Sequence, residues 1–220
     1  MNTSLVASTI AEEMSESISA LGDSDLADAT FSLLNGTWET LGDYGYLAYD
    51  FIDTDSRYQK NNDKHRLAKL VKDGINSEKI NRTLHIVFED YYGNLTEEQQ
   101  QLLNRRQTAG IAGGAIANNY LFKNVTGTLL TGFFPRFFTG LTITTTYTLG
   151  GKIARSTYGS RQLMNDAPDL YWKLRSEGDL DLLYFLIEKY AEPFVKASKI
   201  KNTNPVLFEE INNKFFSLGL

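Results

Sequence analysis

Apolar residues recur at intervals of three and four along most of the chain, which is the spacing of amphipathic α-helices. The positions predicted to face a core are Leu5, Ile10, Met14, Ile18 and Leu21; Leu26, Ala29, Phe31 and Leu34; Leu67, Leu70 and Val71; Ile80, Leu84, Val87 and Phe88; Leu180, Leu183, Tyr184, Ile187 and Ala191; and Val206, Phe208, Ile211, Phe215 and Leu218. The stretch 38–51 is interpreted as a further helix, with an irregular aromatic segment as the alternative. The pattern therefore predicts a mainly α fold.

Start and stop residues agree with this pattern. Glycines follow the first two predicted helices at Gly22 and Gly36. Thr96 has Gln99 three residues later, the spacing of a capping box, and Pro168 stands where a helix is predicted to begin. We expect a helical domain that shelters the chemically different middle of the chain.

The middle segment, residues 105–161, is rich in glycine and threonine. Eight of the 17 glycines lie between residues 107 and 156, although each Gly inside a soluble helix costs about 1 kcal/mol relative to Ala. Small residues recur there at intervals of four, a spacing that lets helix backbones approach closely in lipid. They are Ala109, Gly110, Gly113, Gly114 and Ala117. A close crossing of two helices in water is the alternative.

Residues 124–151 contain a single charge, Arg136, which follows Pro135. A membrane helix needs about 20 mainly apolar residues, and these two residues split the stretch into parts of 11 and 15. The letters TGFF precede the split and FFTG follow it, so we predict a hydrophobic hairpin whose tip is suited to a membrane interface. The predicted tip comprises Phe133, Phe134, Pro135, Arg136, Phe137 and Phe138.

Threonines follow the tip at every second position. They are Thr142, Thr144, Thr146 and Thr148. Alternation of this kind indicates an amphipathic strand, whereas in a helix the hydroxyls would bond to their own backbone or line a wet seam. Both interpretations place hydroxyls opposite an apolar face and predict the lining of a water-filled path, so the hairpin is predicted to be either helical or β.

Charge is distributed unevenly along the chain. Residues 1–60 carry 11 acidic and 2 basic residues (−9), residues 61–98 carry 7 and 6 (−1), and residues 166–220 carry 9 and 7 (−2). Residues 99–165 contain no Asp or Glu and seven Lys or Arg, a balance of +7. Inserted carboxylates are costly in lipid, and cations at segment ends are drawn to anionic headgroups. This acid-free segment therefore favours action at a membrane over a basic hairpin within a soluble domain.

No catalytic or metal-binding motif emerges. There is no cysteine, and His65 and His85 are interpreted as helix-surface histidines. A calcium-loop pattern that starts at Asp53 lacks the required Gly and Glu, and Ser156, Thr157 and Ser160 have no nucleophile-elbow context. We predict no enzyme, metal or cofactor. The net charge of −5 argues against nucleic-acid binding.

The Gly-rich hairpin in a small, cysteine-free, largely helical chain resembles the pore-forming antibacterial toxins, in particular the ion-leak effectors of type VI secretion systems and more distantly the colicin pore domains. The resemblance implies ion leakage and depolarisation at a target cell's inner membrane, self-association in that membrane, a cognate immunity protein and a secretion-machine carrier. The N-terminus has no signal-peptide pattern, so we expect synthesis in a bacterial cytoplasm.

Two other functions stay open, a soluble helical interaction or adaptor module and a lipid-active enzyme. We expect an acidic helical region (1–104), a membrane-active hairpin (105–161) and a C-terminal helical region (162–220), packed as one domain in water.

Overall fold

The computed structural model describes residues 3–22, 57–73, 76–108 and 146–218. All regular elements within these ranges are helices, which confirms the prediction of a mainly α fold. They are α1 (Thr3–Gly22), α4 (Arg57–Lys72), α5 (Ser77–Tyr92), α6 (Glu97–Thr108), α9 (Thr146–Asp166), α10 (Pro168–Ser176), the 3-10 helix η3 (Leu180–Leu183), α11 (Tyr184–Thr203) and α12 (Pro205–Ser217). The predicted helix at 26–34, the stretch 38–51 and residues 109–145 of the hairpin lie outside the described ranges.

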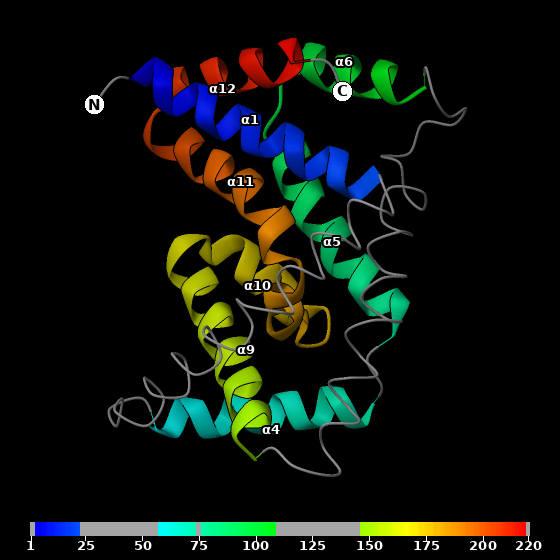
Figure 1. Ribbon diagram of the computed structural model, residues 1–220, viewed down its shortest axis with the longest axis vertical. Helices are drawn as coiled ribbons and strands as arrows, with labels where there is room; N and C mark the ends of the chain where they lie inside the picture. Colours follow the sequence, from blue (N-terminus) through cyan, green and yellow to red (C-terminus); the bar gives the residue numbers. More distant parts are fainter. Residues whose placement is uncertain (1–2, 23–56, 74–75, 109–145, 219–220) are drawn as a thin grey trace.

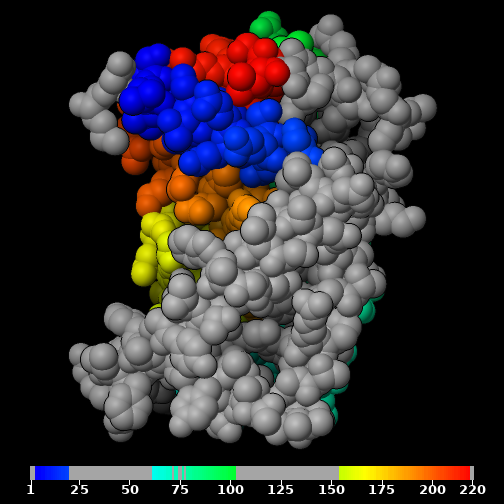
Figure 2. Space-filling view, viewed as in Figure 1, coloured from blue at the N-terminus to red at the C-terminus, as the bar shows by residue number. Residues whose placement is uncertain are grey.

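The helices form a stack along the longest axis of the molecule (Figure 1). At one end α1 packs against α12 and α11, and α11 also packs against α5. Below them lie α10, η3 and α9, and α4 crosses the far end of the stack, where it packs against α9. Figure 2 shows α1 and α12 at the top of one face, α11 beneath them, and residues of α9 and α10 lower still.

The hydrophobic core of this stack is centred on aromatic rings. The ring of Phe194 in α11 lies 4.7 Å from that of Phe88, 5.2 Å from that of Tyr91 and 6.1 Å from that of Phe215, measured between centroids. The hydroxyl of Tyr91 donates a 2.7 Å hydrogen bond to Asn212 Oδ1, so its polar group is satisfied inside the core. Three distant helices, α5, α11 and α12, are joined by these contacts.

The predicted helix starts are confirmed. Thr96 and Gln99 form the capping box, since Thr96 N donates to Gln99 Oε1 at 3.0 Å and Gln99 N donates to Thr96 Oγ1 at 3.3 Å. Pro168 occupies the first turn of α10, as Pro205 does in α12. Thr96 and Gln99 satisfy backbone N–H donors that a helix start leaves unpaired, and the two prolines have no backbone N–H that needs a partner.

Among the predicted core positions whose burial the structure describes, most are buried and Ile18 is partly buried, but three are exposed. Leu5, Val206 and Leu218 are 66%, 79% and 47% exposed. Leu5 and Val206 belong to the first turns of their helices, and Leu218 follows the end of α12, so periodicity continues there beyond the packed part of each helix. The segment 180–183, predicted as α-helix, is a 3-10 helix.

Candidate functional site: a polar cluster around α9

α9 is the C-terminal part of the acid-free segment, and its buried side is polar. Ser156, Thr157 and Ser160 are each no more than 2% exposed. The hydroxyl of Ser156 donates to the carbonyl of Leu182 at 2.7 Å, and that of Ser160 donates to Asp181 Oδ2 at 2.5 Å. Thr157 bonds within the helix to Ala154 O at 2.9 Å. Two of the three hydroxyls therefore attach α9 to η3.

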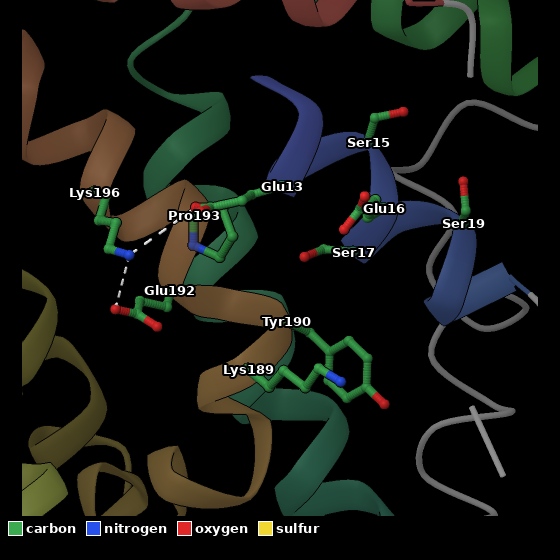
Figure 3. A pocket seen from close by; sticks show the side chains of 10 residues that line it. All are labelled: Glu13, Ser15, Glu16, Ser17, Ser19, Lys189, Tyr190, Glu192, Pro193 and Lys196. Carbon is green, nitrogen blue, oxygen red and sulfur yellow. Dashed lines mark ion pairs between the residues drawn. The ribbon is translucent and has the colours of Figure 1, made fainter. Parts of the chain in front are cut away.

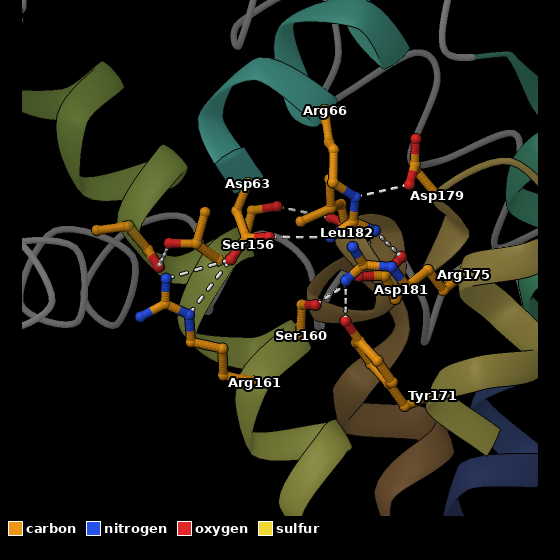
Figure 4. Close-up of polar contacts among 12 residues, drawn as sticks. Asp63, Arg66, Ser156, Ser160, Arg161, Tyr171, Arg175, Asp179, Asp181 and Leu182 are labelled. Atoms are coloured by element: carbon orange, nitrogen blue, oxygen red, sulfur yellow. Dashed lines mark hydrogen bonds and ion pairs between the residues drawn. The ribbon is translucent and has the colours of Figure 1, made fainter. Parts of the chain in front are cut away.

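Arg66 of α4 binds the other oxygen of the same carboxylate, that of Asp181. Arg66 donates from Nη2 to Asp181 Oδ1 at 2.5 Å, from Nε to Asp179 Oδ1 at 2.6 Å and from Nη1 to Asp63 Oδ1 at 3.0 Å. Figure 4 shows Arg66 directed at Asp179 and Asp181, with Ser160 below. The Asp181 side chain is fully buried and that of Arg66 is 10% exposed, so the charges are largely removed from water.

Asp63 binds a second arginine, which comes from α9. Arg161 donates to Asp63 Oδ2 from Nε at 3.3 Å and from Nη2 at 3.2 Å. The two oxygens of Asp63 thus bridge Arg66 in its own helix and Arg161 in α9 (Figure 4). This carboxylate holds the end of the helical stack together.

Arg175 in α10 is the third cation near the buried carboxylates. It donates from Nη1 to the hydroxyl of Tyr171, and its charge acts on Asp181. We call the set of three aspartates, three arginines and the serine the polar cluster: Asp63, Asp179, Asp181, Arg66, Arg161, Arg175 and Ser160. With all six ionisable groups charged, the cluster has no net charge, which limits the cost of burying it.

The turn between α10 and η3 brings Asp179 and Asp181 to the guanidinium of Arg66. Gly178 has φ of 100° and Asp179 has φ of 63°, both in the left-handed region that Gly adopts readily and Asp tolerates. The chain therefore reverses within two residues. As a result Asp179 and Asp181, which are two positions apart, both reach Arg66.

Burial and neighbouring charges shift the pKa values of Asp181 and Arg66 in opposite directions. Burial raises the pKa of Asp181, while the hydrogen bond from Ser160 and the charge of Arg66 oppose that rise. Burial alone would lower the pKa of Arg66, but the charge of Asp181 and the hydrogen bond to Asp179 outweigh it and raise the pKa. The guanidinium therefore keeps its proton, and the balance at Asp181 depends on its three partners.

A second carboxylate faces α9 from α11. Burial raises the pKa of Glu188, and the positive charge of Arg155 in α9 opposes this shift. The two arginines of α9 are thus accompanied by acids from other helices, Arg161 by Asp63 and Arg155 by Glu188. Neighbours in space supply the carboxylates that the acid-free segment lacks in sequence.

A groove about 460 Å³ in volume runs between α1 and α11 (Figure 3). Its lining is Glu13, Ser15, Glu16, Ser17, Ser19, Lys189, Tyr190, Glu192, Pro193 and Lys196. Lys196 Nζ lies 3.0 Å from Glu192 Oε1 and 4.0 Å from Glu13 Oε2, so charged groups of the groove pair with one another across it. This mixed charge selects no particular ligand, whereas the polar cluster has defined geometry.

The serine hydroxyls of α9, which are candidate nucleophiles by residue type, attach α9 to η3. The Ser156 and Ser160 hydroxyls are buried and hydrogen-bonded. Residues 57–64, the second part of the calcium-loop pattern that lacks the required Gly and Glu, belong to α4. Across the described ranges no group of three or more His, Asp or Glu is placed to hold a metal ion.

Both histidines lie on helices, as predicted. His65 in α4 is exposed, and the His85 side chain in α5 is 27% exposed with Nδ1 3.1 Å from Glu89 Oε2. The interpretation as a surface residue of a helix is confirmed for His65, whereas His85 is partly buried.

Of the residues predicted to act in a membrane, Thr146 and Thr148 lie in the described structure. Both fall in the first turn of α9, so at these two positions the described structure is helical. The other predicted residues lie outside the described ranges. They are Ala109, Gly110, Gly113, Gly114, Ala117, Phe133, Phe134, Pro135, Arg136, Phe137, Phe138, Thr142 and Thr144.

Sequence reasoning did not find the aspartates and Arg66 of the cluster. The one local sign is Asp181, an acid that interrupts the apolar run from Leu180 to Ile187. An acid inside such a run is expected to have a buried partner, but the sequence does not reveal which cation provides it.

None of the helices in the described part of the chain combines the length and the apolar character of a membrane span. Comparison of the chain with protein-family models, with curated proteins and with solved structures gave no match.

Proposed function

We propose that the chain is an antibacterial pore-forming toxin that inserts its central hairpin into the inner membrane of a target cell and causes ion leakage and depolarisation. The observation that carries this proposal is the absence of Asp and Glu from residues 99–165, although the chain has 27 of them. Carboxylates are rare and costly in a bilayer, whereas Lys and Arg extend their charged ends to its surface. A long segment with cations alone is suited to that environment.

The helical body is suited to hold such a segment in water before insertion. Asp63 pairs with Arg161 of α9 at 3.2 Å, and Asp181 accepts from Ser160 at 2.5 Å. These contacts join α9 to two other helices through polar groups. Separation of α9 would exchange these polar contacts for water or for lipid headgroups, and it would also expose Leu163, which is buried in the core.

The membrane form follows from the small and hydroxylated residues. Close packing at Ala109, Gly113 and Ala117 would allow helices to associate, and the alternating threonines would line the path of the ions. The phenylalanines beside Pro135 and Arg136 would enter the interface first.

The proposal includes two kinds of protein partner. A chain of this kind made in a bacterial cytoplasm endangers its own cell, so a cognate immunity protein is required. The first 60 residues, with a charge balance of −9, offer a surface for a basic partner. A carrier of the secretion machine would deliver the chain to the neighbouring cell.

Planar-bilayer recording with the full-length protein tests this function. Stepwise current is the expected result, because discrete pores open one at a time. A folded protein that passes no current at either polarity, when added to either face, would overturn the proposal. Vesicles would then separate the alternatives: hydrolysed lipid indicates a lipid-active enzyme, and intact lipid with retained dye indicates an interaction module.

A further inference from the structure

One side of α9 presents positive and aromatic side chains. Arg155, Tyr158 and Arg161 follow one another at intervals of three, so they form a continuous stripe on the helix. Cζ of Arg161 lies 5.8 Å from the ring centre of Tyr158, within the range of a cation–π contact. We call these three residues the α9 stripe.

Both arginines of the stripe face carboxylates from other helices. The guanidinium of Arg161 directs Nε and Nη2 at a single oxygen of Asp63 in α4, at 3.3 and 3.2 Å. Burial raises the pKa of Glu188 in α11, and the positive charge of Arg155 opposes that rise. In this structure Arg161 of the stripe thus binds an anionic group that belongs to the protein itself.

We propose that the α9 stripe is a binding site for the anionic headgroups of lipids, which take the places of Asp63 and Glu188 when α9 separates from α4 and α11. The inference rests on the proposed membrane function and adds a second membrane-binding element to the predicted hairpin. Guanidinium groups bind phosphate as they bind carboxylate, through paired N–H donors. A tyrosine between them is suited to the headgroup region.

The side of α9 that faces the body is made of small residues from Ala154 to Ser160, and Leu163 is buried in the core after them. Between positions 154 and 160 the buried residues are Ala154, Ser156, Thr157, Gly159 and Ser160. They bury little apolar area, and apolar area is what makes separation of helices costly in water. Ser156 and Ser160 instead hold α9 by hydrogen bonds to η3, which water and headgroups can replace.

The position of α9 in the chain indicates what the exchange of protein carboxylates for lipid headgroups would achieve. α9 begins at Thr146, directly after residues 109–145, which contain the predicted hairpin. Attachment of the stripe to an anionic bilayer would keep the hairpin beside the membrane that it enters. Lipid-headgroup binding would thus precede insertion and be measurable without it.

The Arg161–Asp63 pair allows a test in which one contact is removed from either side. Asp63→Asn and Arg161→Gln both break the pair, but only Arg161→Gln removes a cation from the stripe. Full-length variants are floated with vesicles of phosphatidylcholine alone and of an equal mixture with phosphatidylglycerol. We expect Asp63→Asn to bind the anionic vesicles more strongly than wild type and Arg161→Gln to bind them about fivefold less, the effect of one arginine at such a surface.

A matched pair of variants controls for overall charge. Lys173 Nζ lies 2.5 Å from Asp90 Oδ1, which joins α10 to α5 away from the stripe. Asp90→Asn and Lys173→Gln change the net charge by the same amounts as the two test variants. We expect neither to alter vesicle binding appreciably. Circular dichroism and thermal melts establish that all four variants are folded.

The outcomes separate this inference from the proposed function. Opposite effects of Asp63→Asn and Arg161→Gln, with no matching effect in the control pair, support the stripe as a lipid site. Shifts in the same direction, or equal shifts in the control pair, overturn it. Flotation measures binding and bilayer recording measures conduction, so variants that bind as expected but pass no current would sustain the lipid site while overturning the pore.

Discussion

Arg66 Nη2 in α4 and Asp181 Oδ1 in η3 lie 2.5 Å apart, although 115 positions separate the two residues in the chain. The contact fixes the position of α4 at the end of the helical stack (Figure 1). It also supplies the buried Asp181 carboxylate with its closest cation. A pair of this kind contributes most visibly when one partner is removed, because the other then stays buried without compensation.

Substitution of Arg66 by methionine tests that contribution. Arg66→Met keeps most of the side-chain length and leaves Asp181 without its guanidinium, so we expect a loss of about 3–5 kcal/mol in the free energy of unfolding. Arg82 provides the control, since it pairs with Glu177 where both side chains are 45% exposed. Arg82→Met should cost less than about 1 kcal/mol. Denaturant unfolding measures both, and equal losses would contradict a special role for the buried pair.

The hydroxyl of Ser160 is expected to stabilise the same carboxylate. Ser160→Ala removes the 2.5 Å hydrogen bond to Asp181 Oδ2, and bonds to charged groups are worth about 1.5–3 kcal/mol. Ser176 is the matched control, because its hydroxyl bonds to Lys173 O at an exposed position. We expect Ser176→Ala to change stability little. If thermal melts give the same small effect for both serines, the attachment of α9 through Ser160 is weaker than the geometry indicates.

The turn that presents Asp179 and Asp181 depends on Gly178. Its φ of 100° is rarely adopted by other residues, although no atom would obstruct an added Cβ. Gly178→Ala should therefore destabilise the protein by about 1 kcal/mol or more through backbone strain alone. Gly159→Ala, in the middle of α9, is the contrasting variant. Its Cβ would contact Phe185 Cβ at 3.4 Å, and the gain in helix propensity opposes that contact. Unfolding experiments should show a larger loss for Gly178→Ala than for Gly159→Ala.

The helices were predictable because their signals are local. Spacing of apolar residues placed Ile10 and Met14 in the core, and the pair Thr96 and Gln99 marked the start of α6. The polar cluster was not predictable, because apart from the Arg66–Asp63 pair its contacts between helices join residues 21 to 115 positions apart. Local periodicity also fails at helix ends, where Leu5 and Val206 continue the pattern into solvent. The distribution of charge along the chain indicated that residues 99–165 are unusual. It did not indicate that Asp63 in α4 would pair with Arg161 of this segment.

The pKa of Asp181 predicts an unusual pH dependence. Burial raises it above the ordinary value of 3.8, so above that value the folded chain retains this proton longer than the unfolded chain does. By linkage, the contribution of Asp181 to stability then decreases as pH rises from about 4 through its folded pKa. Asp181 therefore favours the folded state in acid, and protonation of this carboxyl would not by itself release α9.

Comparison with Asp181→Asn isolates this effect. The difference in unfolding free energy between wild type and variant should fall as pH rises above about 4 and then level off. Other titrating groups, including Glu188, contribute to both proteins and largely cancel. Arg66, Ser160 and Arg175 determine where the decrease ends, since they favour the ionised carboxylate. A difference that instead grows with pH would mean that the ion pair with Arg66 lowers the pKa of Asp181 below its ordinary value.

The proposed pore makes a separate prediction for the small residues of the middle segment. Gly110→Leu and Gly114→Leu should abolish the current across a planar bilayer, because larger side chains keep the membrane helices apart. Both substitutions favour a helix in water, so thermal stability should be retained. At the predicted tip, Arg136→Glu should reduce the current because a carboxylate enters lipid at high cost, whereas the matched Arg136→Lys should retain it. Glycine variants that unfold the protein, combined with full current from Arg136→Glu, would place these residues in a structural hairpin and not in a pore.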